Sequence, residues 1–257
     1  MQRVFLSDDG HPAETAALCR RHRLGIEVQA FYDPAVVEND PRAVEKHLET
    51  VVGVSDRALH GCFGDLCPGS FDSMVRDVAR NRFELSYDVA RRMRAQHLIL
   101  HHGYVPHTSP PGSWLKRCAA FWKDFLADKD GSIGIHIENL LDQEPALLAD
   151  LIDAIGRPWV DANLDVGHVH CNSKKGIETW VRVLGRRIGY AHLHDNHGEE
   201  DEHLALGKGT LPLREALTML EETAPSACWC VEVNTECLEE SLQWLGRNGF
   251  AARPTGA

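Results

Sequence analysis

Short apolar runs alternate with longer stretches of helical periodicity along the whole chain. The short runs predict eight β-strands, at residues 3–6, 25–29, 58–62, 97–101, 134–138, 162–165, 188–194 and 228–233. The stretches between them predict eight helices, at residues 13–22, 41–52, 73–94, 113–127, 144–155, 174–184, 213–222 and 236–247. Ser73 and Ser113 are candidate N-caps of two of these helices.

Regular alternation of strands and helices indicates a parallel sheet. Eight such units in 257 residues match a single closed (β/α)8 TIM barrel. The alternative is an open doubly wound sheet, but no GxGxxG motif follows any predicted strand. We expect one domain over residues 1–257, with residues 251–257 as a frayed tail.

Composition and charge narrow the class of protein. The chain is 43% hydrophobic and 25% charged, which is typical of a globular protein and excludes a disordered one. A net charge of −11 disfavours nucleic acid as a partner. The sequence shows no signal peptide and no apolar stretch of membrane-spanning length, so we expect a cytoplasmic protein without membrane contact.

Histidine is unusually frequent, with 15 residues, and several histidines and acids close the predicted strands. In a TIM barrel the catalytic groups lie at the carboxyl ends of the strands. The strand-end candidates are His60, His101, Glu138, Asp165, His192, His194 and Glu232. Period-two alternation turns Glu138 toward the barrel axis, opposite Ile135 and Ile137, and places His192 and His194 together on the inner face of their strand.

Four of these residues predict a divalent-metal site: Glu138, Asp165, His192 and Glu232. Carboxylates supply hard, charged oxygen ligands, and neutral imidazole suits Mn²⁺, Co²⁺ or Zn²⁺. The alternative is that barrel strands simply end in polar residues near water. Four acids or histidines at the ends of consecutive strands favour the metal site.

Further residues are candidates for a second ligand group or for substrate contact: His60, His101, His168, Asp201 and His203. Their alternative is a loop position satisfied by backbone hydrogen bonds. Lys208, in the glycine-flanked loop after residues 188–194, is a weak candidate for phosphate binding or part of a plain turn. Four aromatic residues either line a substrate wall or pack the loops: Phe31, Tyr32, Phe63 and Trp114.

Together these motifs resemble the xylose isomerase-like barrel superfamily. The resemblance runs from about Val4 to Phe250 and is carried by IHIEN at 135–139, DVGH at 165–168, HLHDN at 192–196, DEHLALGKG at 201–209 and Glu232. The superfamily includes sugar epimerases, hydroxypyruvate isomerase and the type IV apurinic/apyrimidinic endonucleases. The resemblance indicates the superfamily and leaves the individual activity open.

Resemblance to the isomerases and epimerases implies one divalent metal, Mn, Co, Mg or Zn, held by the four strand-end ligands. Glu138 and Glu232 would then exchange protons with a sugar, sugar phosphate or related hydroxy-ketone through a metal-stabilised enediolate. His168 would contact the substrate and His60 would lie at the pocket. This metal-dependent sugar isomerase or epimerase is our leading interpretation, and the sequence is compatible with a homo-oligomer.

Resemblance to the endonucleases implies up to three zinc ions on nine matched positions: His60, His101, Glu138, Asp165, His168, His192, Asp201, His203 and Glu232. The alternative function is therefore a phosphodiesterase acting on abasic DNA. The acidic charge counts against it, as do HLHDNHG in place of an HLND-type segment and DVGH in place of DTCH. A third alternative is a non-catalytic barrel that binds a polyol or a metal, and lyases with the same enediolate chemistry complete the range.

Overall fold

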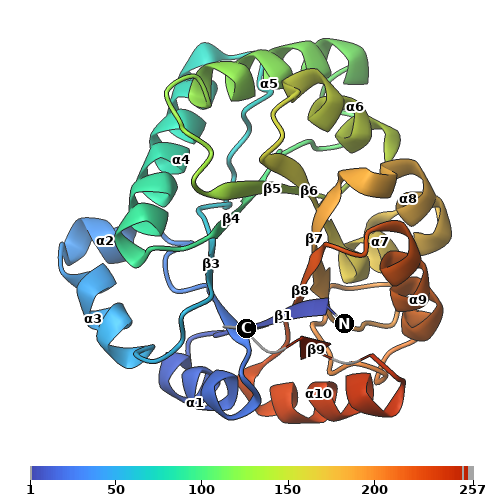
Figure 1. The fold of residues 1–257 in the computed structure, drawn as a ribbon. Coiled ribbons are helices and arrows are strands. Elements are labelled where there is room, and N and C mark those ends of the chain that lie inside the picture. Colours follow the sequence, from blue (N-terminus) through green and yellow to red (C-terminus); the bar gives the residue numbers. More distant parts are fainter. Residues whose placement is uncertain (1, 251, 254–257) are drawn as a thin grey trace.

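A closed ring of eight parallel strands forms the centre of the molecule (Figure 1). The computed structural model describes residues 2–250 and 252–253. Each strand pairs with the next, and β8 returns to pair with β1, so the ring closes. The strands are β1 (Gln2–Ser7), β2 (Gly25–Val28), β3 (Arg57–His60), β4 (His97–His101), β5 (Gly134–Glu138), β6 (Val160–Asp165), β7 (Ile188–Leu193) and β8 (Cys228–Val231). The predicted (β/α)8 barrel is confirmed, and the open sheet is excluded.

Helices surround the ring on its outside (Figure 1). They are α1 (Pro12–His22), α2 (Ala35–Asn39), α3 (Ala43–Thr50), α4 (Ser73–Met93), α5 (Pro111–Phe125), α6 (Ala146–Ile155), α7 (Val166–Asn172), α8 (Ile177–Leu184), α9 (Leu213–Thr223) and α10 (Leu238–Arg247). Two short helices were not predicted from the sequence: α2, with five residues, and α7, with seven. Helices of two turns or fewer carry too little periodicity to stand out from a loop.

The two predicted N-caps are wrong. In α4 the cap is Asp72, one residue before Ser73, and its Oδ1 accepts a hydrogen bond from the backbone N–H of Met74 at 2.8 Å. In α5 the helix begins at Pro111, two residues before Ser113. Proline fits this first position because its fixed φ matches the helix and its missing N–H would have no partner there.

Side chains alternate between two cores, as the period-two pattern predicts. Ile135 and Ile137 of β5 are fully buried in the core between the ring and the helices. A second, smaller apolar cluster fills the inside of the ring, formed by Phe5, Ala58, Ile99, Tyr190, Cys228 and Cys230. This plug leaves the inner face at the carboxyl ends of the strands for polar residues.

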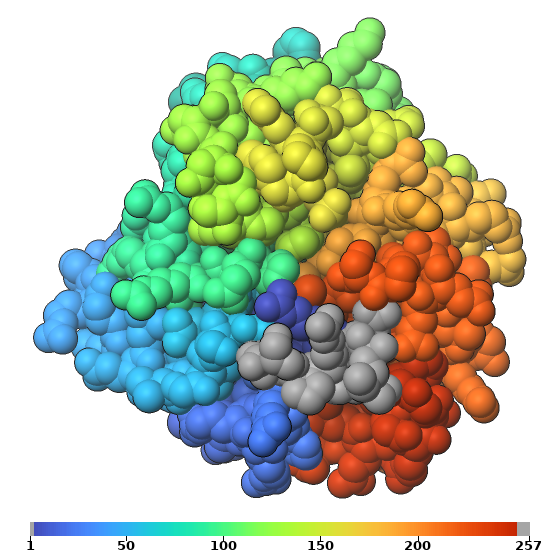
Figure 2. All heavy atoms as spheres, in the orientation of Figure 1, coloured from blue at the N-terminus to red at the C-terminus, as the bar shows by residue number. Residues whose placement is uncertain are grey.

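The first and last units of the chain lie side by side. Figure 2 shows the segments following one another around the molecule, so that the blue first unit meets the red last one. Arg21 of α1 and Glu239 of α10 form an ion pair of 3.3 Å across this junction. Of the predicted frayed tail, Ala252 and Arg253 form a short strand, β9, beside β1, and residues 251 and 254–257 lie outside the described part.

Across residues 2–250 and 252–253, every helix is too short or too polar to cross a membrane.

Candidate active site

A cavity of about 530 Å³ opens at the carboxyl ends of the strands. Seven of the nine predicted site residues line it: His60, His101, Glu138, His168, Asp201, His203 and Glu232. The other two, Asp165 and His192, are fully buried and touch the cavity residues from below. The structure therefore brings all nine together from strands and loops that are far apart in the chain.

Three of the four predicted metal ligands converge on the fourth, His192. Its Nδ1 lies 3.0 Å from Glu232 Oε2, 3.3 Å from Glu138 Oε2 and 3.7 Å from Asp165 Oδ2. This buried nitrogen makes no hydrogen bond of acceptable geometry with the described residues. An unsatisfied nitrogen facing three carboxylates is a donor set that fits a divalent cation.

Glu27 holds the opposite edge of the His192 ring. Both of its oxygens lie near His192 Nε2, at 3.1 and 3.2 Å, and Glu27 is fully buried. Gln29 donates from Nε2 to Glu27 at 3.3 Å and to Glu232 at 2.6 Å. A carboxylate at Nε2 keeps the proton on that nitrogen and leaves the Nδ1 lone pair facing the other acids.

Two further histidines face Glu138. Its Oε2 lies 3.4 Å from His60 Nε2 and 3.5 Å from His101 Nε2, and it accepts a hydrogen bond of 2.9 Å from Asn163. Both ring nitrogens of His101 are buried without a hydrogen bond to the described residues. The neighbouring His102 instead contacts Asp142 at 2.9 Å, away from this group. His101 therefore faces Glu138 and the cavity, and His102 does not.

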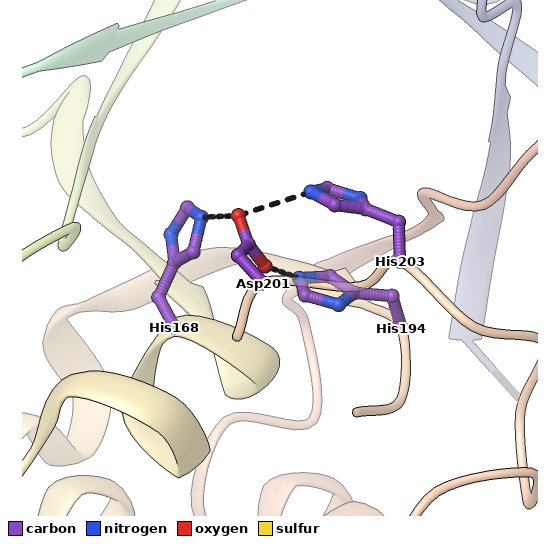
Figure 3. Close-up of side chains that lie close together, drawn as sticks. All are labelled: His168, His194, Asp201 and His203. Atoms are coloured by element: carbon purple, nitrogen blue, oxygen red, sulfur yellow. Dashed lines mark hydrogen bonds and ion pairs between the residues drawn. The ribbon is translucent and has the colours of Figure 1, made fainter. Parts of the chain in front are cut away.

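A second cluster lies beside the first group (Figure 3), and His168 Nδ1 is 3.3 Å from Glu138 Oε1. Asp201 Oδ2 is 3.1 Å from His168 Nε2 and 3.2 Å from His203 Nε2. The far nitrogens of both rings contact backbone carbonyls at 2.9 Å, His168 that of Asn139 and His203 that of Glu232. These carbonyls accept a hydrogen bond from each Nδ1, and both Nε2 atoms face the Asp201 carboxylate. The Nε2 atoms donate to it when the rings are protonated, and in neutral rings their lone pairs would be available to a cation there.

His194 joins this cluster, although the sequence did not distinguish its role. Its Nε2 lies 3.6 Å from Asp201 Oδ1 and 3.1 Å from Asp165 Oδ1, and its ring stacks on His203 with centroids 4.0 Å apart. His194 therefore links Asp165 to the Asp201 cluster. The alternation placed it on the inner face with His192, which was the available signal.

Asp165 owes its position to the turn between β6 and α7. Its Oδ1 accepts a hydrogen bond of 2.7 Å from the backbone N–H of His168 and so caps α7. The Asn139 side chain makes two hydrogen bonds with the backbone of Asp165. Its Nδ2 donates to the carbonyl at 3.1 Å, and its Oδ1 accepts from the N–H at 3.0 Å. The Asp165-x-x-His168 spacing is therefore both a helix start and a means of placing two site residues.

Burial and charge act against each other on the histidines. Burial lowers the pKa of His192, but Glu232, Glu27 and Glu138 outweigh it and hold this pKa well above the usual range. Burial also lowers the pKa of His203, but Asp201 and Glu232 raise it to about 10. At His101 burial prevails and its pKa is lowered. The carboxylates thus demand positive charge at specific nitrogens, from protons or from a cation.

The carboxylates show the complementary shifts. Burial raises the pKa of Glu138, but His192 and His101 outweigh it and hold this pKa well below the usual range. The pKa of Glu232 is also lowered, because His192 and His203 overcome the effect of burial. Both carboxyl groups are therefore ionised at neutral pH and available as proton acceptors or metal ligands.

The remaining predicted residues divide between the cavity and the packing around it. Tyr32 and Phe63 line the cavity, whereas Phe31 and Trp114 are buried, 4% and 2% exposed. Lys208 does not line the cavity, and its ammonium group pairs with Glu240 of α10. In the described part of the chain, Lys208 therefore lies outside the cavity, and its phosphate contact stays a prediction.

Comparison with known families and proteins agrees with the fold. The sequence pattern of the family described as xylose isomerase-like TIM barrel matches residues 25–248. Among solved structures, a protein from Thermus thermophilus soaked with ZnCl2 superposes with a TM-score of 0.79 at 23% identity, covering 98% of this chain and 99% of that one. D-psicose 3-epimerase in the presence of D-fructose gives 0.74 at 15% identity, covering 98% and 100%.

Curated relatives are distant. Fructoselysine 3-epimerase of Escherichia coli O157:H7 is 21% identical over 177 residues, which cover 66% of this chain and 64% of that protein. The chain spans 61% to 66% of the lengths of the curated relatives it matches. These similarities establish that the chain shares the barrel fold with these proteins. The activities named belong to the relatives.

Proposed function

The chain belongs to the xylose isomerase-like TIM barrel family, and we propose that it is a divalent-metal-dependent isomerase or epimerase of a sugar or a related small hydroxy-ketone. One observation carries the proposal: carboxylate oxygens of Glu138, Asp165 and Glu232 surround Nδ1 of His192 within 3.7 Å. Epimerase activity in relatives that share the barrel supports the reaction class.

The residues at this point fit a divalent cation. Glu138, Asp165, Glu232 and Nδ1 of His192 would hold it, with Glu27 orienting the histidine from behind. When bound, the cation supplies Lewis acidity, which polarises the substrate carbonyl and stabilises the enediolate. A site with several carboxylate oxygens and one imidazole suits Mn²⁺, Co²⁺, Mg²⁺ or Zn²⁺. The metal content of the purified protein identifies which of these ions it binds.

Glu138 and Glu232 are the proposed proton-transfer pair. Glu138 ends β5 and Glu232 directly follows β8. Both lie near His192 Nδ1, at 3.3 and 3.0 Å, and both line the cavity. One carboxylate accepts the proton from the carbon next to the carbonyl. The other takes up a proton from water and delivers it to the product, and the first releases its proton to water to complete the cycle. Positioned proton transfer of this kind contributes about 10²–10⁴-fold to the rate.

Metal content and turnover test the proposal together. We expect the purified, untagged protein to hold about one equivalent of Mn, Co, Mg or Zn per chain, and to interconvert at least one ketose. Removing the metal with a chelator should abolish turnover, and adding it back should restore it. A metal-loaded protein that leaves a broad panel of ketoses unchanged would contradict the proposed activity.

One observation favours a second candidate function, a phosphodiesterase acting on abasic DNA. His168, Asp201 and His203 direct their donor atoms to one point beside the first group, as three further ligands would. Three equivalents of tightly bound zinc per chain, together with cleavage of an abasic oligonucleotide, would favour the phosphodiesterase over the isomerase or epimerase. The net charge of −11 remains the argument against it.

A further inference from the structure

Negative charge dominates the cavity. Five carboxylates line it, from Asp9, Glu138, Asp201, Glu202 and Glu232, and two more, from Glu27 and Asp165, are buried directly beneath it. No Lys or Arg is among the described residues that line it. A divalent cation at the four predicted ligands would offset two of these seven charges. The cavity therefore repels a phosphate group and attracts a cation.

Asp9 is the cavity carboxylate that makes no hydrogen bond or ion pair with the described residues. It follows β1, and burial raises its pKa, an effect that the nearby His11 and His203 partly offset. By contrast, Asp201 is held by His168 and His203, and Glu202 accepts a hydrogen bond of 2.8 Å from the backbone N–H of His197. Asp9 is consequently the carboxylate best able to receive a positive group of the substrate.

One wall of the same cavity is aromatic rather than acidic. Tyr32 stacks on Phe63 with centroids 5.3 Å apart, and Phe63 stacks on His101 at 5.2 Å. Tyr32 is 50% exposed, so this wall continues from the histidines out to solvent. Aromatic faces accept the C–H groups of a sugar chain and attract cations rather than anions.

We propose that this cavity takes an unphosphorylated ketose that carries an ammonium group at the end remote from the reacting carbonyl. Asp9 binds the ammonium group, the Tyr32–Phe63 wall supports the carbon chain, and the corresponding phosphate ester is rejected. This inference rests on the proposed function and defines its substrate class.

Three probes that differ at a single position test the inference. D-fructose, 6-amino-6-deoxy-D-fructose and D-fructose 6-phosphate carry a neutral, a positive and a negative group at the same carbon. Their dissociation constants for the metal-loaded protein are measured by titration calorimetry. We expect the amine to bind about tenfold more tightly than D-fructose, and the phosphate about tenfold more weakly.

Asp9→Asn isolates the contribution of the free carboxylate. Asp9 has φ +28°, a conformation that asparagine also tolerates, so the substitution removes the charge with little strain. The advantage of the amine over D-fructose, with both measured on this variant, should fall to within about threefold. Asp77→Asn is the matched control, because Asp77 is exposed on α4 and lies outside the cavity. This control should keep the full preference.

The outcomes separate this inference from the proposed function. Equal or tighter binding of the phosphate, an amine preference that survives Asp9→Asn, or no binding of any probe would overturn the substrate class. Preferential binding of the amine without isomerisation of any ketose would support the substrate class and contradict the proposed reaction. Turnover of the phosphate ester in preference to the other two probes would support the proposed reaction and contradict the substrate class.

Discussion

At the scale of single residues, the site depends on groups that hold other groups in place. Glu27 fixes His192 from the buried side, and Gln29 joins Glu27 to Glu232. Inward-facing strand ends could be predicted, because alternation and barrel topology determine them. Glu27 was missed because it lies before the end of β2, within an apolar strand whose residues are all buried. Its role exists only through contact with β7, which the sequence does not show.

We predict that Glu27→Gln weakens metal binding about 10- to 100-fold. The amide keeps the size of the side chain but removes the charge that holds the proton on His192 Nε2. Titration with Mn²⁺ or Zn²⁺ measures the affinity, and circular dichroism checks the fold. Glu200→Gln, an exposed loop change outside the cavity, is the control. An affinity equal to that of the unmodified protein would show that Glu27 does not orient His192.

Glu232→Gln should abolish isomerase turnover while it leaves the fold intact. The amide cannot accept or return a proton, so we expect a loss of at least about 10²-fold in kcat. The assay is the interconversion of the best ketose from the screen, with metal content measured on the same sample. Turnover near that of the unmodified protein would remove Glu232 from the proton-transfer pair.

At the scale of elements, the β6–α7 turn places Asp165 and His168 and leaves no room for a side chain at Gly167. A Cβ on Gly167 would lie 1.9 Å from His194 Cε1. The long strands and helices were predictable because their periodicity spans many residues. The short helix α7 was not predictable, because it depends on individual contacts rather than on a periodic pattern. These contacts are the Asp165 cap and the two hydrogen bonds between the Asn139 side chain and the Asp165 backbone.

We predict that Gly167→Ala destabilises the protein by about 1–3 kcal/mol, as overpacked cores do. The free energy of unfolding is measured by urea denaturation. Gly112→Ala is the matched glycine control, because an added Cβ there meets nothing within 4 Å in the first turn of α5. The control should be neutral or stabilising, by up to about 1 kcal/mol. Equal effects of the two changes would mean that the turn is not tightly packed against His194.

At the scale of the whole molecule, stability without metal should depend on protons held by the site. Against the effect of burial, Asp201 and Glu232 raise the pKa of His203 to about 10. A histidine pKa above its unfolded value of about 6.5 adds stability that is complete below that pH and is lost as the pH rises toward 10. The metal-free protein should therefore lose stability between pH 7 and pH 10.

Urea denaturation of the metal-free protein across this pH range measures the effect. Saturating divalent metal should raise the free energy of unfolding, because binding at 100 times Kd adds about 2.7 kcal/mol. A metal-free protein that gains stability from pH 7 to pH 10 would contradict the arrangement of charges described for the site.

The central claim is that Glu138 and Glu232 exchange protons with a ketose at a metal-dependent site, and hydrogen exchange with solvent tests it most directly. The metal-loaded protein is incubated with a panel of ketoses in D2O, and NMR detects deuterium at the carbon next to the carbonyl. We predict deuterium incorporation into at least one ketose, absent after chelation and absent in Glu232→Gln. A fully metal-loaded protein that leaves every ketose without deuterium would contradict the account.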